Sequence, residues 1–143
     1  MKPIKQLSLF IENRTGALAE VCRVLNDANV NIYAATVADT SEFGILRLLM
    51  DDIAKGNAAL KAAGFITREN EVLALCVPDK VGGLVEVFNV TDKLGLAVEY
   101  MYAIPGKMTG KAVIIFRFND STAAEKLSAA GLELLDAADI ARA

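Results

Sequence analysis

The sequence contains no histidine, no tryptophan and only two cysteines. The absence of histidine excludes the usual general base, the Ser-His and Cys-His pairs, and imidazole metal ligands. Cys22 falls in an apolar helical pattern and Cys76 in a strand-like run, so we expect two buried thiols in a reducing cytosol. The sequence contains no recognisable activated nucleophile and no metal-binding cluster, which argues against an enzyme. We also expect no cofactor.

A large excess of positive or negative charge is also missing. Fifteen Lys and Arg residues against eighteen Asp and Glu leave a formal charge of −3, which gives no electrostatic footprint for nucleic acid. No apolar run approaches the roughly 18 residues of a membrane span, and the first residues lead into no signal-peptide core. We therefore expect a soluble, cytoplasmic protein that binds neither nucleic acid nor membrane.

Apolar residues, by contrast, are abundant. They make up 54% of the 143 residues, and the mean hydropathy is +0.37. This composition excludes a disordered chain and leaves some apolar surface for a partner. The length suits one ordinary domain or two small ones that share a core.

The chain repeats itself once. Residues 11–21 (IENRTGALAEV) align with residues 77–87 (VPDKVGGLVEV), 66 positions further on. The identical pairs are Gly16 with Gly82, Leu18 with Leu84, Glu20 with Glu86, and Val21 with Val87. Two copies are too few for a solenoid, so the repeat predicts two similar domains, residues 1–70 and 71–143.

Hydrophobic periodicity alternates in the same order in both copies. The first copy predicts strand 5–11, a helix from 17 to 28, strands 30–38 and 44–50, a helix capped by Asp51, and a strand from 65. The second predicts strand 72–77, helix 82–94, strands 96–104 and 112–118, helix 121–130 and strand 132–135. The order βαββαβ predicts an α+β fold: two ferredoxin-like domains in tandem, each an antiparallel sheet with both helices on one face.

Two further expectations concern packing. The inward face of the first helix is predicted to hold Ala17, Leu18, Val21, Cys22, Val24, Leu25 and Ala28, and Asn29 is predicted to end it. In the next helix, Ile53, Leu60 and Ala63 are expected to point inward. Residues 65–77 are expected to form nearly continuous extended chain, so the two sheets should lie close together.

The most informative segment is the loop Glu12–Leu18 (ENRTGAL), which ends a strand and opens a helix. The unpaired N–H groups at a helix start favour a carboxylate or a phosphate. Gly16 has no Cβ, so a ligand can approach its backbone closely. Asn13 offers a donor and an acceptor, which suits the ammonium and carboxylate of a free amino acid. On the residues alone, a simple helix-capping turn is the alternative reading.

The stretch ENRTGALAEVCRVLNDANVNI resembles the first strand, loop, helix and second strand of an ACT domain, an amino-acid-sensing module attached to many biosynthetic enzymes. VPDKVGGLVEVFNVTDKLGLAVEYMY repeats the pattern, so the resemblance covers essentially the whole chain. It is greatest to stand-alone bacterial tandem-ACT proteins without a catalytic domain. The resemblance implies allosteric regulation by a bound amino acid or related metabolite, and a homodimer.

The resemblance also implies site residues. In serine-sensing ACT domains, one Asn in the first loop and another early in the second strand hold the effector, and Asn13 and Asn31 match those places. The histidine of that pattern is Ile11 here. Asp79 and Ala97 replace the two asparagines in the second copy, so the resemblance implies no complete second site of the same kind. The predicted ligand-binding residues, near the contact between the copies, are Asn13, Arg14, Thr15, Gly16, Ala17, Leu18, Asn31, Asp79, Gly82, Gly83 and Leu84.

Two other functions stay open. The chain is alternatively a regulatory subunit that mainly docks on an amino-acid biosynthetic enzyme, or a small ferredoxin-like enzyme, because the fold alone does not exclude catalysis. An RNA-binding sheet is poorly supported, since the strands lack the required basic and aromatic pattern. The sequence thus favours a non-catalytic protein that binds an amino acid.

Overall fold

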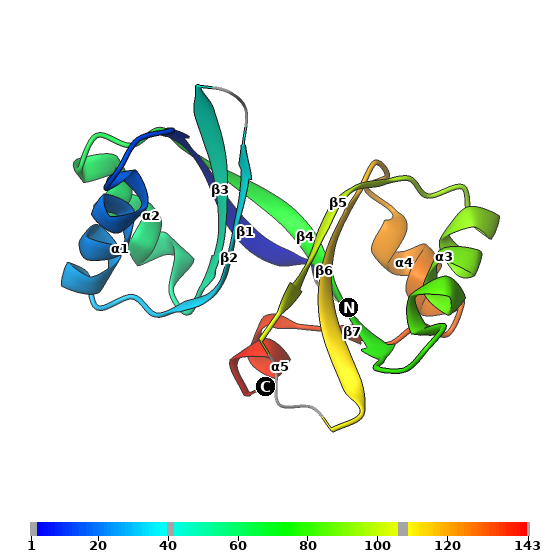
Figure 1. Ribbon diagram of the computed structural model, residues 1–143. Coiled ribbons are helices and arrows are strands. Elements are labelled where there is room, and N and C mark those ends of the chain that lie inside the picture. The colour runs from blue at the N-terminus through cyan, green and yellow to red at the C-terminus, as the bar shows by residue number, and fades with distance from the viewer. Residues whose placement is uncertain (1–2, 40–41, 106–108, 143) are drawn as a thin grey trace. The chain divides into compact units, whose positions relative to one another are not determined.

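The computed structural model describes residues 3–39, 42–105 and 109–142, which form two compact units (Figure 1). The first unit is Lys5–Asn70, and the second runs from Glu71 onward and includes Pro3 and Ile4. Strand β4 (Thr67–Pro78) ends the first unit and begins the second. The predicted stretch of continuous extended chain is therefore confirmed.

The first unit follows the predicted βαββαβ order. It contains β1 (Ile4–Glu12), α1 (Ala17–Asp27), β2 (Ile32–Asp39), β3 (Phe43–Met50), α2 (Ile53–Ala62) and the start of β4. The strand order is β2-β3-β1-β4, and β3 pairs antiparallel with both β1 and β2. This order is the ferredoxin-like arrangement that the sequence predicted.

The second unit repeats the order with one addition. After β4 come α3 (Gly83–Lys93), β5 (Val98–Ile104), β6 (Lys111–Phe118), α4 (Ala123–Ala129) and β7 (Leu134–Leu135). The strand order β5-β6-β4-β7 matches that of the first unit, although β7 is shorter than the predicted strand 132–135. A final helix, α5 (Ala137–Arg142), was not predicted.

Each unit has its own hydrophobic core between one face of its sheet and its two main helices (Figure 1). Apolar residues at alternate strand positions meet the helix residues spaced three or four apart, as the two periodicities require. The buried residues of the first core are Leu7, Leu9, Ile11, Val21, Leu25, Val30, Leu46, Leu48 and Leu60. Those of the second are Leu73, Leu75, Val77, Val87, Leu96, Ile114, Phe116, Phe118, Ala123, Leu127 and Leu134.

The inward face of α1 is narrower than predicted. Ala17, Val21 and Leu25 form its buried stripe, whereas Leu18 is 45% exposed and Cys22 is also exposed. Leu18 and Cys22 each follow a stripe residue by one position, which turns them toward solvent. The prediction that both thiols are buried is thus wrong for Cys22. Cys76 is partly buried, and this burial raises the pKa of its thiol.

The start and end of α2 also correct the sequence reading. Asp52 caps the helix by accepting the Lys55 N–H at 3.0 Å, so the predicted cap Asp51 is wrong by one residue. Asp51 instead accepts the Asn31 N–H at 3.0 Å and ties the end of β3 to the start of β2. Ala63 follows the last helical residue and is exposed rather than inward. Asn29 has φ 59° just beyond α1, which confirms it as the helix stop.

Candidate functional site

The first loop, Glu12–Gly16, joins β1 to α1 through backbone hydrogen bonds. The Asn13 N–H donates to the Glu42 carbonyl at 3.0 Å, and the Arg14 N–H donates to the Glu12 carbonyl at 2.9 Å. Gly16 takes the left-handed conformation (φ 88°, ψ −8°), which favours glycine, and no side chain of the described residues caps α1. Helix α1 therefore begins at a glycine N-cap, and the Asn13 side chain does not cap it.

This loop leaves two helix N–H groups available. The Ala17 N–H donates to Arg14 at 3.3 Å, and the Glu20 N–H makes the first helical bond, to Gly16, at 3.0 Å. Between them, the N–H groups of Leu18 and Ala19 have no acceptor among the residues that the structure describes. Two adjacent N–H groups at the positive end of a helix dipole suit a carboxylate.

The second loop, Pro78–Gly82, repeats the first bond for bond. The Asp79 N–H donates to Gly110 at 3.0 Å, the Lys80 N–H to Pro78 at 3.0 Å, and the Gly83 N–H to Lys80 at 3.0 Å. Gly82 has φ 87° and ψ −5°, close to the values at Gly16. In the described part of the chain, the N–H groups of Leu84 and Val85 again lack an acceptor.

The cations of both loops are paired with nearby carboxylates. Arg14 donates to both Glu20 oxygens, at 3.1 and 3.0 Å, and to Glu12 at 3.2 Å. The hydrogen bonds to Glu20 are the main reason why the pKa of Arg14 is raised. Lys80 lies 3.5 Å from Glu86. A ligand carboxylate would thus compete with Glu20 or Glu86 for these side chains, while the helix N–H groups have no competitor of that kind.

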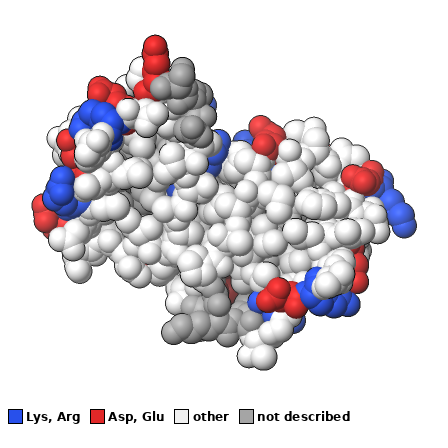
Figure 2. All heavy atoms as spheres, in the orientation of Figure 1, with Lys and Arg blue, Asp and Glu red and all other residues white. Residues whose placement is uncertain are grey.

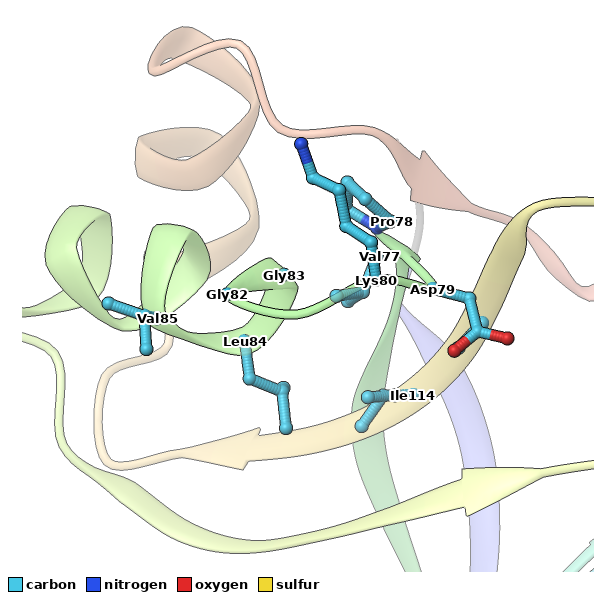
Figure 3. Close-up of a pocket in the computed structure, with 10 residues that line it drawn as sticks. Val77, Pro78, Asp79, Lys80, Gly82, Gly83, Leu84, Val85 and Ile114 are labelled. Carbon is cyan, nitrogen blue, oxygen red and sulfur yellow. The ribbon is translucent and has the colours of Figure 1, made fainter.

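A hollow of about 320 Å³, the second hollow, borders the second loop (Figure 3). Leu84 extends into the space below the loop, Ile114 lies across from it on β6, and Lys80 points the other way. All four residues predicted from the second copy line this hollow. The complete lining is Val77, Pro78, Asp79, Lys80, Gly82, Gly83, Leu84, Val85, Ala112 and Ile114.

The first hollow, of about 300 Å³, lies on a different flank of its loop, toward residues 64–66. Of the residues predicted from the first copy, Arg14 and Ala17 line it, whereas Asn13, Thr15, Gly16 and Leu18 do not. The sequence reading missed its large exposed side chains. Alternation places Phe10 on the opposite face from Leu9 and Ile11, which was a usable signal. The lining is Phe10, Ile11, Glu12, Arg14, Ala17, Glu20, Phe43, Gly64, Phe65 and Ile66.

Near the second loop and on β5, smaller residues stand where the first copy has larger ones. Gly83 stands where the first copy has Ala17, and a Cβ at Gly83 would collide with the Pro78 carbonyl oxygen. Ala103 pairs with Ile114 on β6 as Val37 pairs with Leu46 on β3. The Val37 Cγ1 lies 3.4 Å from the point that a Cβ would occupy on Gly44. The Val37 side chain therefore covers the start of β3. Ala103 carries no such methyl groups over the corresponding end of β6.

The structure does not bring Asn31 to the first loop. Asn13 is bonded to Glu42 at the start of β3, whereas Asn31 is bonded to Asp51 just beyond its end. β3 has eight residues, so at about 3.3 Å per residue these two points lie more than about 20 Å apart. Ala97 is held in the same way, with its N–H donating to Asn119 Oδ1 at 3.0 Å. The backbone at this position therefore has the same structural role in both units.

Neither the surface charge nor a metal-binding cluster indicates a further functional site among the described residues. On the face shown in Figure 2, Lys and Arg lie near Asp and Glu in small mixed groups rather than in one basic patch. No group of three or more His, Cys, Asp or Glu side chains within the described residues could hold a metal ion. None of the described helices is long and apolar enough to cross a membrane.

Comparison with known proteins agrees with the paired fold. A family model described as "ACT domain pair" matches residues 2–142. The crystal structure of protein BT0572 from Bacteroides thetaiotaomicron has a TM-score of 0.89 and 33% identity, covering 96% of this chain and 95% of that one.

More distant structures share the fold. The ligand-free regulatory subunit of aspartate kinase from Thermus thermophilus has a TM-score of 0.63 and 13% identity, with 89% of each chain covered. The corresponding subunit from Thermus flavus has a TM-score of 0.64 and 14% identity, with 89% of this chain and 90% of that one covered. A search of curated proteins finds no match to this chain.

Proposed function

This chain belongs to the family of ACT domain pairs, and from that premise we propose that it is a non-catalytic regulatory protein that binds an amino acid or a related metabolite. One observation carries the proposal. Both copies build the same strand-to-helix loop with two adjacent N–H groups left over, and in the second copy this loop borders a hollow. That arrangement suits a small ligand with a carboxylate.

The second loop is the better candidate for the site. The ligand carboxylate would accept from the N–H groups of Leu84 and Val85, and its ammonium would face the carboxylate of Asp79, which lines the hollow. The apolar part of the ligand would lie against Leu84 and Ile114. The first loop offers the same N–H groups, with the Asn13 amide in place of Asp79. We therefore rank it second.

Asn31 fits the proposal only in a larger assembly. A ligand on Asn13 cannot also touch Asn31 of the same unit, so a joint site requires a second copy of the chain. The homodimer implied by the family resemblance would provide one. Ligand binding would then favour one arrangement of the protein by its higher affinity for that arrangement.

A second function, docking on an amino-acid biosynthetic enzyme in the cytoplasm, is favoured by a different observation. Phe10, Phe43 and Ile66 are 59%, 51% and 73% exposed around the first hollow. Large apolar side chains gathered in this way mark contact surfaces. The aspartate kinase subunits that share the fold are regulatory partners of an enzyme by name. Replacing Phe10 and Phe43 by serine should abolish copurification with such an enzyme and leave ligand binding intact.

A thermal-shift screen of the twenty amino acids tests the ligand-binding function. At least one amino acid should raise the unfolding temperature of the wild type by several degrees, because binding to the folded state stabilises it. Asp79→Ala should remove most of this shift, and Asn13→Ala should reduce it less. Asp92→Ala removes the same charge from an exposed position near the end of α3 and is the matched control. No response to any amino acid, or an equal response in all variants, would refute the proposal.

A further inference from the structure

Building on the proposed function, we infer that the second hollow selects amino acids with branched aliphatic side chains, such as valine, leucine and isoleucine. The inference rests on the side chains that line the hollow and on one charge at its edge.

The walls of the second hollow are almost entirely apolar. Asp79 and Lys80 are its only polar side chains, and Lys80 points away from the space and pairs with Glu86 (Figure 3). The remaining surface comes from Val77, Pro78, Leu84, Val85, Ala112 and Ile114, with Gly82 and Gly83 between them. A polar ligand side chain here would lose water without gaining a hydrogen-bond partner, whereas an aliphatic one would lose nothing.

Two of these apolar side chains are left exposed without a ligand. Leu84 is 38% exposed and Val85 is 60% exposed, and both lie on the first turn of α3 beside the hollow. An aliphatic ligand would cover part of this area, which is favourable in proportion to the area removed from water. The volume, about 320 Å³, lies at the low end for small-molecule sites and suits a ligand of amino-acid size.

Charge and ring chemistry narrow the class further. Asp79 provides a carboxylate for the ligand ammonium, and an acidic ligand side chain would place a second negative charge near it. None of the residues that line the second hollow is aromatic, whereas three phenylalanines line the first hollow. An aromatic ligand would therefore find no ring partner in the second hollow. Aliphatic amino acids are the class that meets all of these conditions.

The test is calorimetric titration with leucine, isoleucine, valine, alanine, serine, aspartate and phenylalanine. We expect the best branched aliphatic amino acid to bind at least about tenfold more tightly than alanine or serine, because each methylene in an apolar pocket changes affinity by about that factor. Ala112→Val adds two methyl groups to a residue that lines the second hollow and should weaken aliphatic binding at least about tenfold. Ala38→Val makes the same change at an exposed position of β2 and should have no effect.

The outcomes separate this inference from the proposed function. If serine, aspartate or phenylalanine binds most tightly and Asp79→Ala abolishes that binding, the proposed function stands and the aliphatic selectivity is wrong. Aliphatic binding that Ala112→Val leaves unchanged also overturns the inference, since the ligand would then lie elsewhere. If no amino acid binds the folded wild type, the proposed function fails and this inference fails with it.

Discussion

The two strand-to-helix loops have the same backbone and different surroundings. Each places its glycine in the left-handed conformation and makes the same sequence of backbone hydrogen bonds. Yet the hollow beside the first loop opens toward residues 64–66, and the hollow beside the second opens toward β6. The repeat thus fixes the loop through a few shared residues, while single side chains nearby determine where a ligand fits.

The residue that follows each glycine shows this difference most clearly. Ala17 is 5% exposed in the first unit, whereas Gly83 in the second lets the Pro78 carbonyl approach the helix start. Gly83→Ala should therefore lower the free energy of unfolding by about 3 kcal/mol, because a Cβ there meets backbone. The reverse change, Ala17→Gly, should cost about 1 kcal/mol through lost helix propensity. Urea unfolding followed by circular dichroism measures both, and equal costs would contradict the closer approach in the second unit.

The second helices of the two units, α2 and α4, differ in the hydrogen bonds that an aspartate accepts near the helix N-terminus. The Asp52 side chain accepts the Lys55 N–H at 3.0 Å, and Asp52→Ala should cost about 1 kcal/mol as an ordinary lost cap. Asp120 accepts from Lys126 Nζ at 2.7 Å, and from the Thr122 hydroxyl and N–H at 2.6 and 2.7 Å. These bonds, chiefly that from Lys126, hold the pKa of Asp120 well below its usual range.

Because folding lowers the pKa of Asp120, the ionised Asp120 side chain stabilises the folded state in a pH-dependent way. The direction of this stabilisation with pH is defined. It is fully present above the ordinary aspartate pKa of about 3.9 and is lost as the pH falls through the lower value of the folded state. Asp120→Asn should thus be less stable than the wild type at neutral pH, and the difference should shrink below about pH 4. Thermal unfolding across this pH range measures the difference, which salt should reduce because the pair is accessible to solvent. A difference that grows as the pH falls would contradict this assignment.

The smallest effect is expected at the start of β2. Asn31→Ala should change the free energy of unfolding by less than about 0.5 kcal/mol, because the backbone N–H and carbonyl of this residue make the bonds to Asp51. Ala97 already occupies the equivalent place in the second unit. Asp51→Ala, the control, removes the acceptor itself and should cost more. A loss of ligand affinity in Asn31→Ala without a change in stability would show that this side chain acts from another copy of the chain.

The sequence was sufficient for the element order because long periodic segments and the repeat agree. The sequence-based predictions were wrong where the outcome depends on a shift of a single residue, such as a helix cap or the buried face of a helix. Asp51 and Asp52 are equally good caps by type, and only the backbone geometry decides between them. Leu18 fits an apolar helical pattern but lies beside the buried stripe, and the six residues of α5 carry too little periodicity to be predicted.

The candidate site was predictable in part. Glycines 66 positions apart identify the two loops, and the four residues predicted from the second copy line one hollow. The opposite wall is formed by Ala112 and Ile114 of β6, whose positions depend on the pairing of β4 with β6. That pairing joins segments far apart in the chain, and local patterns do not give it. Asn31 lies at the other end of β3 because β2 and β3 pair antiparallel, which places the start of β2 beside the end of β3.

The central question is which helix start receives the ligand. A titration of the ¹⁵N-labelled full chain with leucine, followed residue by residue through the backbone amide resonances, addresses this directly. The largest shifts should occur at the Leu84 and Val85 amides, with much smaller ones at Leu18 and Ala19. Shifts concentrated at Leu18 and Ala19, or none at either pair, would contradict binding at the second loop.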